Sequence, residues 1–225
     1  SSIGGVYTSD LASQRSGVIP QLSDSASSLK RVTDVEAQEH IADVLRLRAV
    51  LGLALILWAA TGVLDWSVVR FVEPGRLSYF LSLRGAALLL MSLAVLRLYI
   101  QPMPSDRLFR FIDLWVFGVA TLGASLLSIK YRGITSPYAH AVSCVLVVRG
   151  VALPSHYRRG IPGVLLPVAI YPCALVVAGQ FIPDIQRQLQ SPAHLAVFLQ
   201  HVSLIAVTAA ITVFGGHSMW SLRRQ

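Results

Sequence analysis

The sequence predicts an all-α polytopic membrane protein whose transmembrane helices form a six-helix transmembrane bundle. Of its 225 residues, 54% are hydrophobic and only 13% are charged, about half the charged share of a soluble globular domain. The apolar residues form six continuous stretches, which lack the two-residue alternation of a membrane β-strand. Because backbone polar groups must be satisfied internally in lipid, each stretch is expected to cross the membrane as a helix.

The first 32 residues differ from the rest of the chain. They are rich in Ser and Gly and poor in large apolar side chains, so they bury too little surface to offset the entropy of ordering and are expected to form a flexible leader, 1–32. The segment Thr33-Asp34-Val35-Glu36 then has the S/T-x-x-E form of a capping box. A helix is therefore expected to begin there and to open the membrane domain, 33–225.

The lengths of the apolar stretches set the expected spans, since about 20 residues at about 1.5 Å each cross the hydrocarbon core. The fourth stretch is the weakest candidate, because it is short and contains Pro137 and His140. The fifth contains three prolines at five-residue intervals, which predicts kinks or local unwinding. The expected spans cover about residues 47–67, 77–98, 111–130, 133–149, 161–182 and 195–217.

The basic residues that flank these spans predict the orientation of the chain. With a cytoplasmic N-terminus, the inner flanks hold ten basic residues, Arg149 among them, and the outer flanks hold five. This predicts a multi-pass protein of the cell (inner) membrane with N- and C-termini cytoplasmic. Asp113 lies near Arg107 and Arg110 at an inner flank and is expected to be solvated or salt-bridged at a helix end.

The formal net charge of +8 points to a lipid surface rather than to nucleic acid. Basic residues punctuate apolar runs and form no stripe with interleaved aromatic residues. The lipid bilayer is therefore the expected partner, and no nucleic acid is expected to bind. At the end of the sixth stretch, Trp220 is expected at the cytoplasmic interface, with Arg223 and Arg224 facing anionic lipid.

The sequence contains no motif of a known catalytic site. A Gly-rich phosphate loop followed by Lys, a His-Arg-Asp triplet, a G-x-S-x-G elbow and an H-E-x-x-H pair are all missing. No catalytic residue, cofactor or metal ligand is therefore predicted, and the chain as given is not expected to be an enzyme. Cys144 and Cys173 lie inside apolar stretches and are expected to be small core residues.

Polar residues within the membrane are costly and are therefore the candidate functional residues. The expected spans place a set of them in the outer half of the bundle: Arg84, Tyr138, His140, His194 and His201. If they face inward together, they could bind an anionic or amphiphilic ligand or sense pH, since imidazole titrates near neutrality. Alternatively, the Arg84 side chain extends to the lipid head groups, and the histidines only form hydrogen bonds with neighbouring helices.

Three segments carry a resemblance to a known family: "VEPGRLSYFLSLR" (72–84), "RGITSPYAHAVSCVLVVRG" (132–150) and the terminal "GGHSMWSLRRQ". They resemble the N-terminal membrane domain of bacterial membrane-anchored serine/threonine protein kinases. The resemblance implies a protein of the bacterial inner membrane in which about six helices precede a cytoplasmic kinase domain beginning after Gln225. It transfers no catalytic residue, because the parts that hold ATP and magnesium are missing here. Membrane domains of similar layout also precede nucleotide cyclases and histidine kinases.

The expected function is a membrane-embedded anchor and sensor that positions and regulates a covalently attached cytoplasmic effector. One alternative is a small transporter or channel, which predicts internal repeats or helices broken at matching positions. The prolines cluster in the fifth stretch alone, which does not match that pattern. Another alternative is a passive anchor. The oligomeric state is left open, and a homodimer is among the arrangements that the sequence allows.

Overall fold

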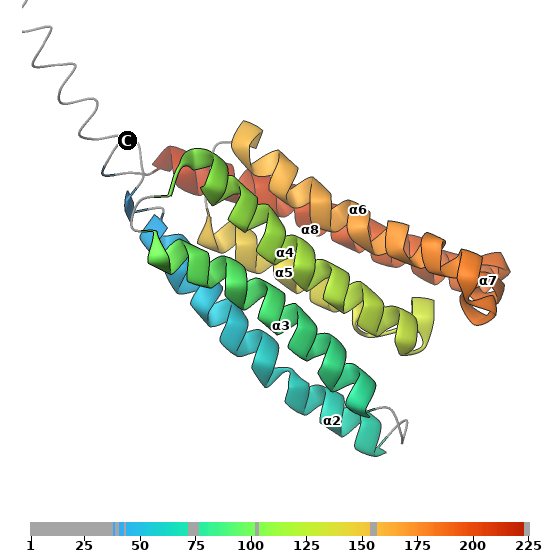
Figure 1. Cartoon of the computed structure of the whole chain (residues 1–225). Helices are drawn as coiled ribbons and strands as arrows, with labels where there is room; N and C mark the ends of the chain where they lie inside the picture. Colours follow the sequence, from blue (N-terminus) through green and yellow to red (C-terminus); the bar gives the residue numbers. More distant parts are fainter. Residues whose placement is uncertain are drawn as a thin grey trace, which may run out of the picture. The chain divides into compact units, whose positions relative to one another are not determined.

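The structure, a computed structural model, describes residues 38, 41, 42, 44–71, 77–101, 104–153 and 157–222. The chain divides into two units, residues 1–43 and 44–225, and the following concerns the second (Figure 1). Every regular element among the described residues is a helix, which confirms the all-α class. The expected capping box at 33–36 and the anchors Arg223 and Arg224 lie outside the described residues.

Helical residues begin at Val44 and continue, with a single turn residue at Thr61, to Phe71. We refer to Val44–Phe71 as the first span; its second part is α2. The elements are α2 (Gly62–Phe71), α3 (Leu77–Ile100), α4 (Asp106–Lys130), the 3-10 turn η1 (Gly133–Thr135), α5 (Ala139–Ala152), α6 (Tyr157–Phe181), α7 (Pro183–Gln190) and α8 (Pro192–Leu222).

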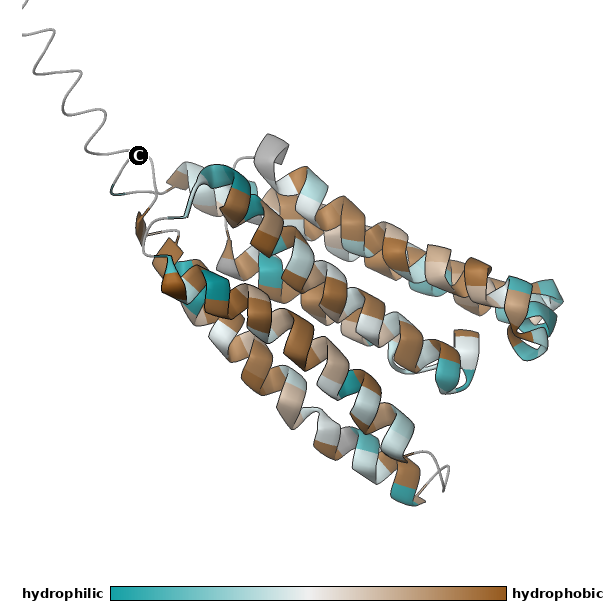
Figure 2. Ribbon diagram, in the orientation of Figure 1, coloured by the Kyte–Doolittle hydropathy of each residue, from teal (hydrophilic) through white to brown (hydrophobic). Residues whose placement is uncertain are grey.

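Five of these helices are long and apolar enough to cross a membrane: the first span, α3, α4, α6 and α8. Figure 2 shows that hydrophobic residues cover them along most of their length. The fourth expected span, 133–149, corresponds to α5, whose 14 residues reach about 21 Å, less than the hydrocarbon thickness of about 30 Å. The described part of the chain therefore has five helices able to span a membrane, and α5 by itself is shorter than the fourth predicted span.

Helix α4 is the central helix of the described bundle. In its most apolar 18 residues 61% are buried, against 11% in α8. Ser105 accepts a hydrogen bond from the Leu108 N–H and caps the helix N-terminus. Small residues let neighbours approach α4 closely; a Cβ added at Gly123 would lie 2.9 Å from the Trp58 ring. Trp58 is thereby seated between the first span and α4.

Helix α5 is short but closely packed against α8. A Cβ added at Gly150 would lie 2.3 Å from the Thr212 methyl group, so only glycine permits this approach. The Thr212 hydroxyl donates to the Leu146 carbonyl at 3.4 Å, a hydrogen bond between helices of the kind that stabilises membrane bundles. This contact fixes α8 against the core through α5.

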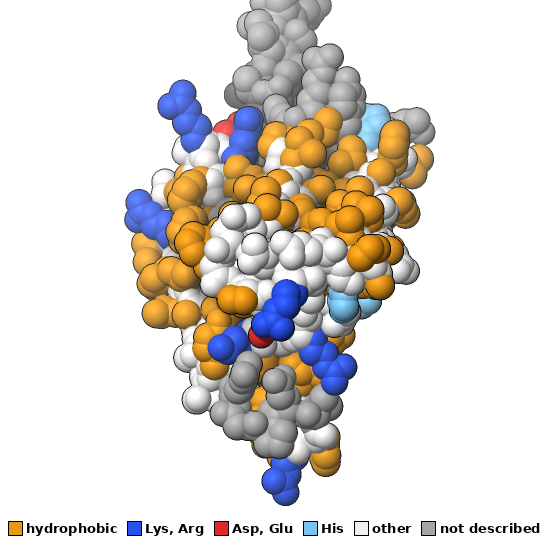
Figure 3. All heavy atoms as spheres, turned by 90° about the vertical axis from the view of Figure 1, so that its right-hand side faces the viewer, with side chains coloured by type: hydrophobic (Ala, Val, Ile, Leu, Met, Phe, Trp, Pro, Cys, Tyr) orange, Lys and Arg blue, Asp and Glu red, His pale blue; other side chains and the backbone are white. Residues whose placement is uncertain are grey.

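One end of the bundle is covered by η1 and α7. The Gln188 side chain accepts a hydrogen bond from the Ile134 N–H at 2.9 Å, and the Ile185 side chain is buried beneath α7. Gly133 has a positive φ of 62°, a backbone conformation that favours glycine. Figure 3 views this end, where Lys and Arg side chains stand among hydrophobic ones.

Helix α6 contains Pro162, Pro167 and Pro172 and nevertheless remains helical from Tyr157 to Phe181. The local unwinding predicted from these prolines does not occur. Prolines inside a membrane helix are tolerated where neighbouring helices and local adjustments satisfy the freed carbonyls. Figure 1 shows α6 lying along α8 for most of its length, which gives it such a neighbour.

Candidate functional site

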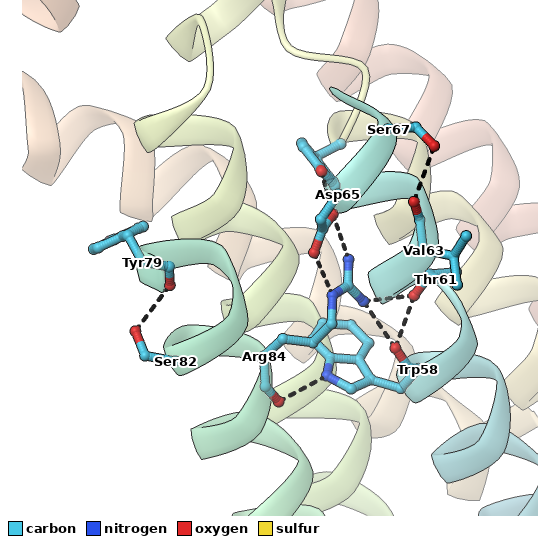
Figure 4. Close-up of polar contacts among 9 residues, drawn as sticks. Trp58, Thr61, Val63, Asp65, Ser67, Tyr79, Ser82 and Arg84 are labelled. Atoms are coloured by element: carbon cyan, nitrogen blue, oxygen red, sulfur yellow. Dashed lines mark hydrogen bonds and ion pairs between the residues drawn. The ribbon is translucent and has the colours of Figure 1, made fainter. Parts of the chain in front are cut away.

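The first feature of the site is a buried ion pair between α3 and the first span (Figure 4). Arg84 donates from Nε to Asp65 Oδ2 at 2.5 Å and from Nη2 to Asp65 Oδ1 at 2.9 Å. Asp65 is fully buried and Arg84 is 7% exposed. Arg84 follows the start of α3 by seven residues, and Asp65 precedes the end of the first span by six. Both therefore lie at about the same depth, roughly 10 Å from their helix ends.

The third guanidinium nitrogen of Arg84, Nη1, donates hydrogen bonds to the first span where its helix is interrupted. The helix is interrupted at Thr61, and Arg84 Nη1 donates to the Trp58 carbonyl at 2.9 Å and to the Thr61 hydroxyl at 2.5 Å. The guanidinium lies over the Trp58 ring, with Arg84 Cζ 5.0 Å from the ring centroid. Trp58 Nε1 donates to the Arg84 carbonyl at 3.2 Å. The Trp58 carbonyl thus accepts from Arg84 and also from the Thr61 hydroxyl, at 2.9 Å each, which satisfies it at the helix break.

Tyr138 joins the same cluster from the N-terminus of α5. Its hydroxyl donates a hydrogen bond to Asp65 Oδ1. Its ring belongs to an aromatic group with Phe80 and Tyr131, with centroids 6.0 to 6.3 Å apart. Asp65 therefore connects the first span, α3 and α5. We refer to Trp58, Thr61, Asp65, Arg84 and Tyr138 as the polar cluster.

A cavity of about 610 Å³ adjoins the polar cluster. Arg84, Thr61, Trp58 and Tyr138 contribute to its wall, together with Ser67. The remaining wall is mostly apolar and comes from the first span, α3, α4 and α5: Ala54, Leu57, Val68, Met91, Val116, Phe117, Ala120, Ala124, Leu127, Pro137, Ala141, Cys144, Val145 and Val148. A pocket with apolar walls and a few convergent polar groups is the usual form of a small-molecule site.

The two cysteines are not core residues, contrary to the sequence prediction. Cys144 and Cys173 are both exposed free thiols. A bundle in lipid has no need to bury an apolar side chain, because the lipid tails are themselves apolar. Both thiols are exposed. They differ in their surroundings, because Cys144 lines the cavity and Cys173 does not.

Two of the three predicted histidines lie in a second group rather than in the polar cluster. His140 and His201 stand with ring centroids 5.3 Å apart, and the Tyr171 hydroxyl is 3.3 Å from His201 Nδ1. His194 interacts instead with the Ser191 hydroxyl at 3.1 Å. Of the five predicted site residues, the structure thus brings Arg84 and Tyr138 together in one group and His140 and His201 in another. The predicted depths placed these groups near one another, but depth alone does not give the helix face.

A second buried ion pair connects α4 and α5. Arg149 donates from Nε to Asp113 Oδ1 at 3.1 Å and from Nη2 to Asp113 Oδ2 at 2.6 Å, and from Nη1 to the Gly160 carbonyl at 3.5 Å. Asp113 was expected to be either solvated or salt-bridged; the structure shows it buried and paired with Arg149. Arg149 is 4% exposed and therefore does not act as a flanking charge in solvent.

Sequence reasoning missed Asp65, the acceptor at the centre of the polar cluster. The signal was present: Asp65 directly follows the apolar run 49–64, at the depth of Arg84 and with the opposite charge. An intramembrane arginine needs such a partner. Trp58 and Thr61 gave no such signal, because their roles depend on the helix break at Thr61.

No protein-family model, curated protein or solved structure matches this chain. Among the residues that the structure describes, no three His, Cys, Asp or Glu side chains gather in a group that could hold a metal ion. The polar cluster forms part of the wall of a mostly apolar cavity.

Proposed function

We propose that this chain is a membrane domain that anchors and regulates a cytoplasmic effector attached after Gln225. The observation that carries the proposal is the length of α8, which has 31 residues. It is about 46 Å long, and about 44 Å along the membrane normal at a tilt of about 20°, against a hydrocarbon core of about 30 Å. The last turns of α8, with Trp220, can therefore extend to the interface and continue as a connector.

The proposed mechanism is a change in helix packing that moves the end of α8. Helix α8 contacts the core chiefly through α5 and α6, and α5 is also connected through Tyr138 to the polar cluster. A ligand that prefers one arrangement of the cluster could thus shift the population of α8 positions. The input has to come from the membrane or from a small molecule, since the connections outside the membrane are short.

In this proposal both chain ends are cytoplasmic. Helices α4 and α6 run in the same direction (Figure 1). The segment between them, which contains α5, therefore has to bring the chain back to the side from which α4 started. Counted with the five long helices, this return supports six crossings, an even number. Removing the buried Arg149 from the count leaves nine basic residues on the proposed inner flanks against five on the outer ones. The excess still favours cytoplasmic ends by the positive-inside rule.

A serine/threonine protein kinase is the effector that we favour, because the segments at 72–84, 132–150 and 215–225 resemble the membrane domains of such proteins. The coding sequence that follows Gln225 tests this part. A Gly-rich loop followed by a Lys-bearing strand is expected. A nucleotide cyclase or a phospho-accepting histidine domain would replace the kinase in the proposal, and the end of the reading frame at Gln225 would contradict an attached effector.

The orientation is tested by reporter fusions in a bacterial inner membrane. A fluorescent protein fused after Gln225 is expected to fluoresce, and a periplasmic phosphatase at the same position is expected to be inactive. A cysteine introduced at Arg187 in α7, with Cys144 and Cys173 replaced by Ala, should react with a membrane-impermeant maleimide added outside intact cells. An active phosphatase at Gln225 would contradict any cytoplasmic effector.

A further inference from the structure

We propose that the cavity binds an uncharged amphiphile from the membrane: a lipid of the diacylglycerol type, with its hydroxyl or carbonyl oxygen at the polar cluster. The proposal does not depend on an attached effector, because it concerns binding alone. It replaces the anionic ligand considered from the sequence. Its basis is the shape and lining of the cavity, the hydrogen bonds left open at Arg84 and Tyr138, and the charge balance of the cluster.

The cavity has the dimensions and lining of a site for a lipid-like molecule. Its volume of about 610 Å³ lies within the range of about 300–1,000 Å³ found for small-molecule sites. Its wall also contains Met91, Phe117 and Val148, apolar side chains that can pack against a hydrocarbon chain and form no strong hydrogen bond. A mostly apolar molecule with a few polar atoms therefore fits this cavity.

The hydrogen bonds within the polar cluster leave room for one more oxygen. A guanidinium has five N–H donors, and Arg84 uses four of them on Asp65, Trp58 and Thr61. No acceptor among the described residues is assigned to the remaining Nη2 N–H. The Tyr138 hydroxyl donates to Asp65 and keeps lone pairs that can accept. A ligand hydroxyl can accept from Arg84 and donate to Tyr138, and a carbonyl can accept from Arg84.

The charge balance of the cluster favours a neutral head group. Asp65 binds Arg84 through both carboxylate oxygens, so the positive charge that faces the cavity is already compensated. An anion would have to compete with the fully buried Asp65 carboxylate for Arg84. It would also lose its hydration on entering the cavity, and this loss costs much more for a charged group than for a hydroxyl or ester group.

The cavity can be reached from the lipid. Leu57 on the first span and Cys144 on α5 line the cavity and are also exposed. A molecule that diffuses in the bilayer can therefore enter sideways between these helices. Ser67 and Val68, farther along the first span, line the same cavity, so its wall extends past the polar cluster along this span.

A photolabelling experiment tests the proposal on the whole chain. The protein is reconstituted in phosphatidylcholine vesicles that contain a diacylglycerol with a diazirine in one acyl chain, irradiated, digested and analysed by mass spectrometry. Labelling is expected to concentrate on α4 and α5 residues of the cavity, such as Phe117, Ala141 and Val145. Unlabelled diacylglycerol is expected to reduce it about tenfold at saturation, whereas phosphatidic acid, with the same tails and an anionic head, is not.

Two independent changes should close the cavity. Ala141→Phe fills it and is expected to lower labelling about tenfold, as a loss of about 1.4 kcal/mol in binding would do; Ala86→Phe, at an exposed position of α3 outside the cavity, should leave labelling unchanged. Alkylation of Cys144 after folding, in a Cys173→Ala chain, should have the same blocking effect. Alkylation of Cys173 in a Cys144→Ala chain should have none.

The chemical modification keeps the test valid if Ala141→Phe fails to fold. Labelling spread over all lipid-facing helices, or unchanged by alkylation of Cys144, would overturn the cavity as a binding site. Labelling that phosphatidic acid competes as well as diacylglycerol does would overturn the neutral head group. Neither result would bear on the side of the membrane on which Gln225 lies.

Discussion

The two buried ion pairs use the same chemistry in different surroundings. Arg149 and Asp113 connect α4 to α5, and the guanidinium is packed against Gly163 of α6. Arg84 and Asp65 connect α3 to the first span beside a cavity of about 610 Å³, with Trp58 and Tyr138 as further partners. A buried ion pair is by itself weak support for either stability or function. The difference suggests a closed structural clamp at Arg149 and a ligand-accessible group at Arg84.

The largest expected effect comes from breaking the closed pair. Arg149→Leu leaves the Asp113 carboxylate buried without its cation, and we expect a loss of about 3–5 kcal/mol in the free energy of unfolding. Unfolding in detergent by titration with sodium dodecyl sulfate measures this. Arg107→Leu, at an exposed position in the first turn of α4, serves as the control and should change stability little. Equal effects of the two substitutions would contradict the clamp.

Removing one hydrogen bond from the open pair should have the next effect. Tyr138→Phe keeps the ring contacts with Phe80 and removes the donor to Asp65; because the acceptor is charged, a loss of about 1.5–3 kcal/mol is expected. Tyr131→Phe is the matched control, since Tyr131 belongs to the same aromatic group and its hydroxyl has no hydrogen bond assigned to the described residues. The same unfolding measurement compares them, and a larger effect of Tyr131→Phe would count against the Tyr138 contact.

A comparable loss in the free energy of unfolding is expected when a methyl group is added next to the Arg149–Asp113 pair. A Cβ at position 163 would lie 2.0 Å from Arg149 Nη2, while a Cβ at position 62 would lie 3.5 Å from Arg84 Cδ, an ordinary contact. Gly163→Ala is therefore expected to destabilise by about 1–3 kcal/mol through overpacking. Gly62→Ala should be neutral or stabilise by about 0.4–1 kcal/mol through the unfolded state. If Gly62→Ala were the more damaging change, the contrast between the two pairs would be lost.

The smallest expected effect concerns the histidine group, which belongs to neither pair. Tyr171→Phe removes the contact between the Tyr171 hydroxyl and His201, and hydrogen bonds between membrane helices average about 0.6 kcal/mol. A change of this size in unfolding is expected, with no change in photolabelling of the cavity. Loss of labelling in Tyr171→Phe would show that the two groups act together, as the sequence had suggested.

The sequence predicted much of the fold because length and hydropathy determine which helices can span. Five of the predicted spans correspond to helices that are long and apolar enough to cross a membrane, and the weakest stretch, with Pro137 and His140, forms the short α5. The partners of the intramembrane charges were harder to predict. Arg149 was counted as a flanking charge, although it is buried against Asp113, because hydropathy reports depth along a helix and not the direction in which a side chain points. Asp65 was missed for the same reason.

The contrast between the pairs is tested most directly by replacing each with apolar residues of similar volume and measuring lipid photolabelling. Arg149→Met with Asp113→Leu, and Arg84→Met with Asp65→Leu, remove both charges of a pair, which avoids the penalty of an unpaired buried charge. We expect the first double variant to retain diacylglycerol labelling of the cavity and the second to lose it. Retained labelling after replacement of Arg84 and Asp65, or equal loss in both variants, would contradict the assignment of ligand binding to the polar cluster.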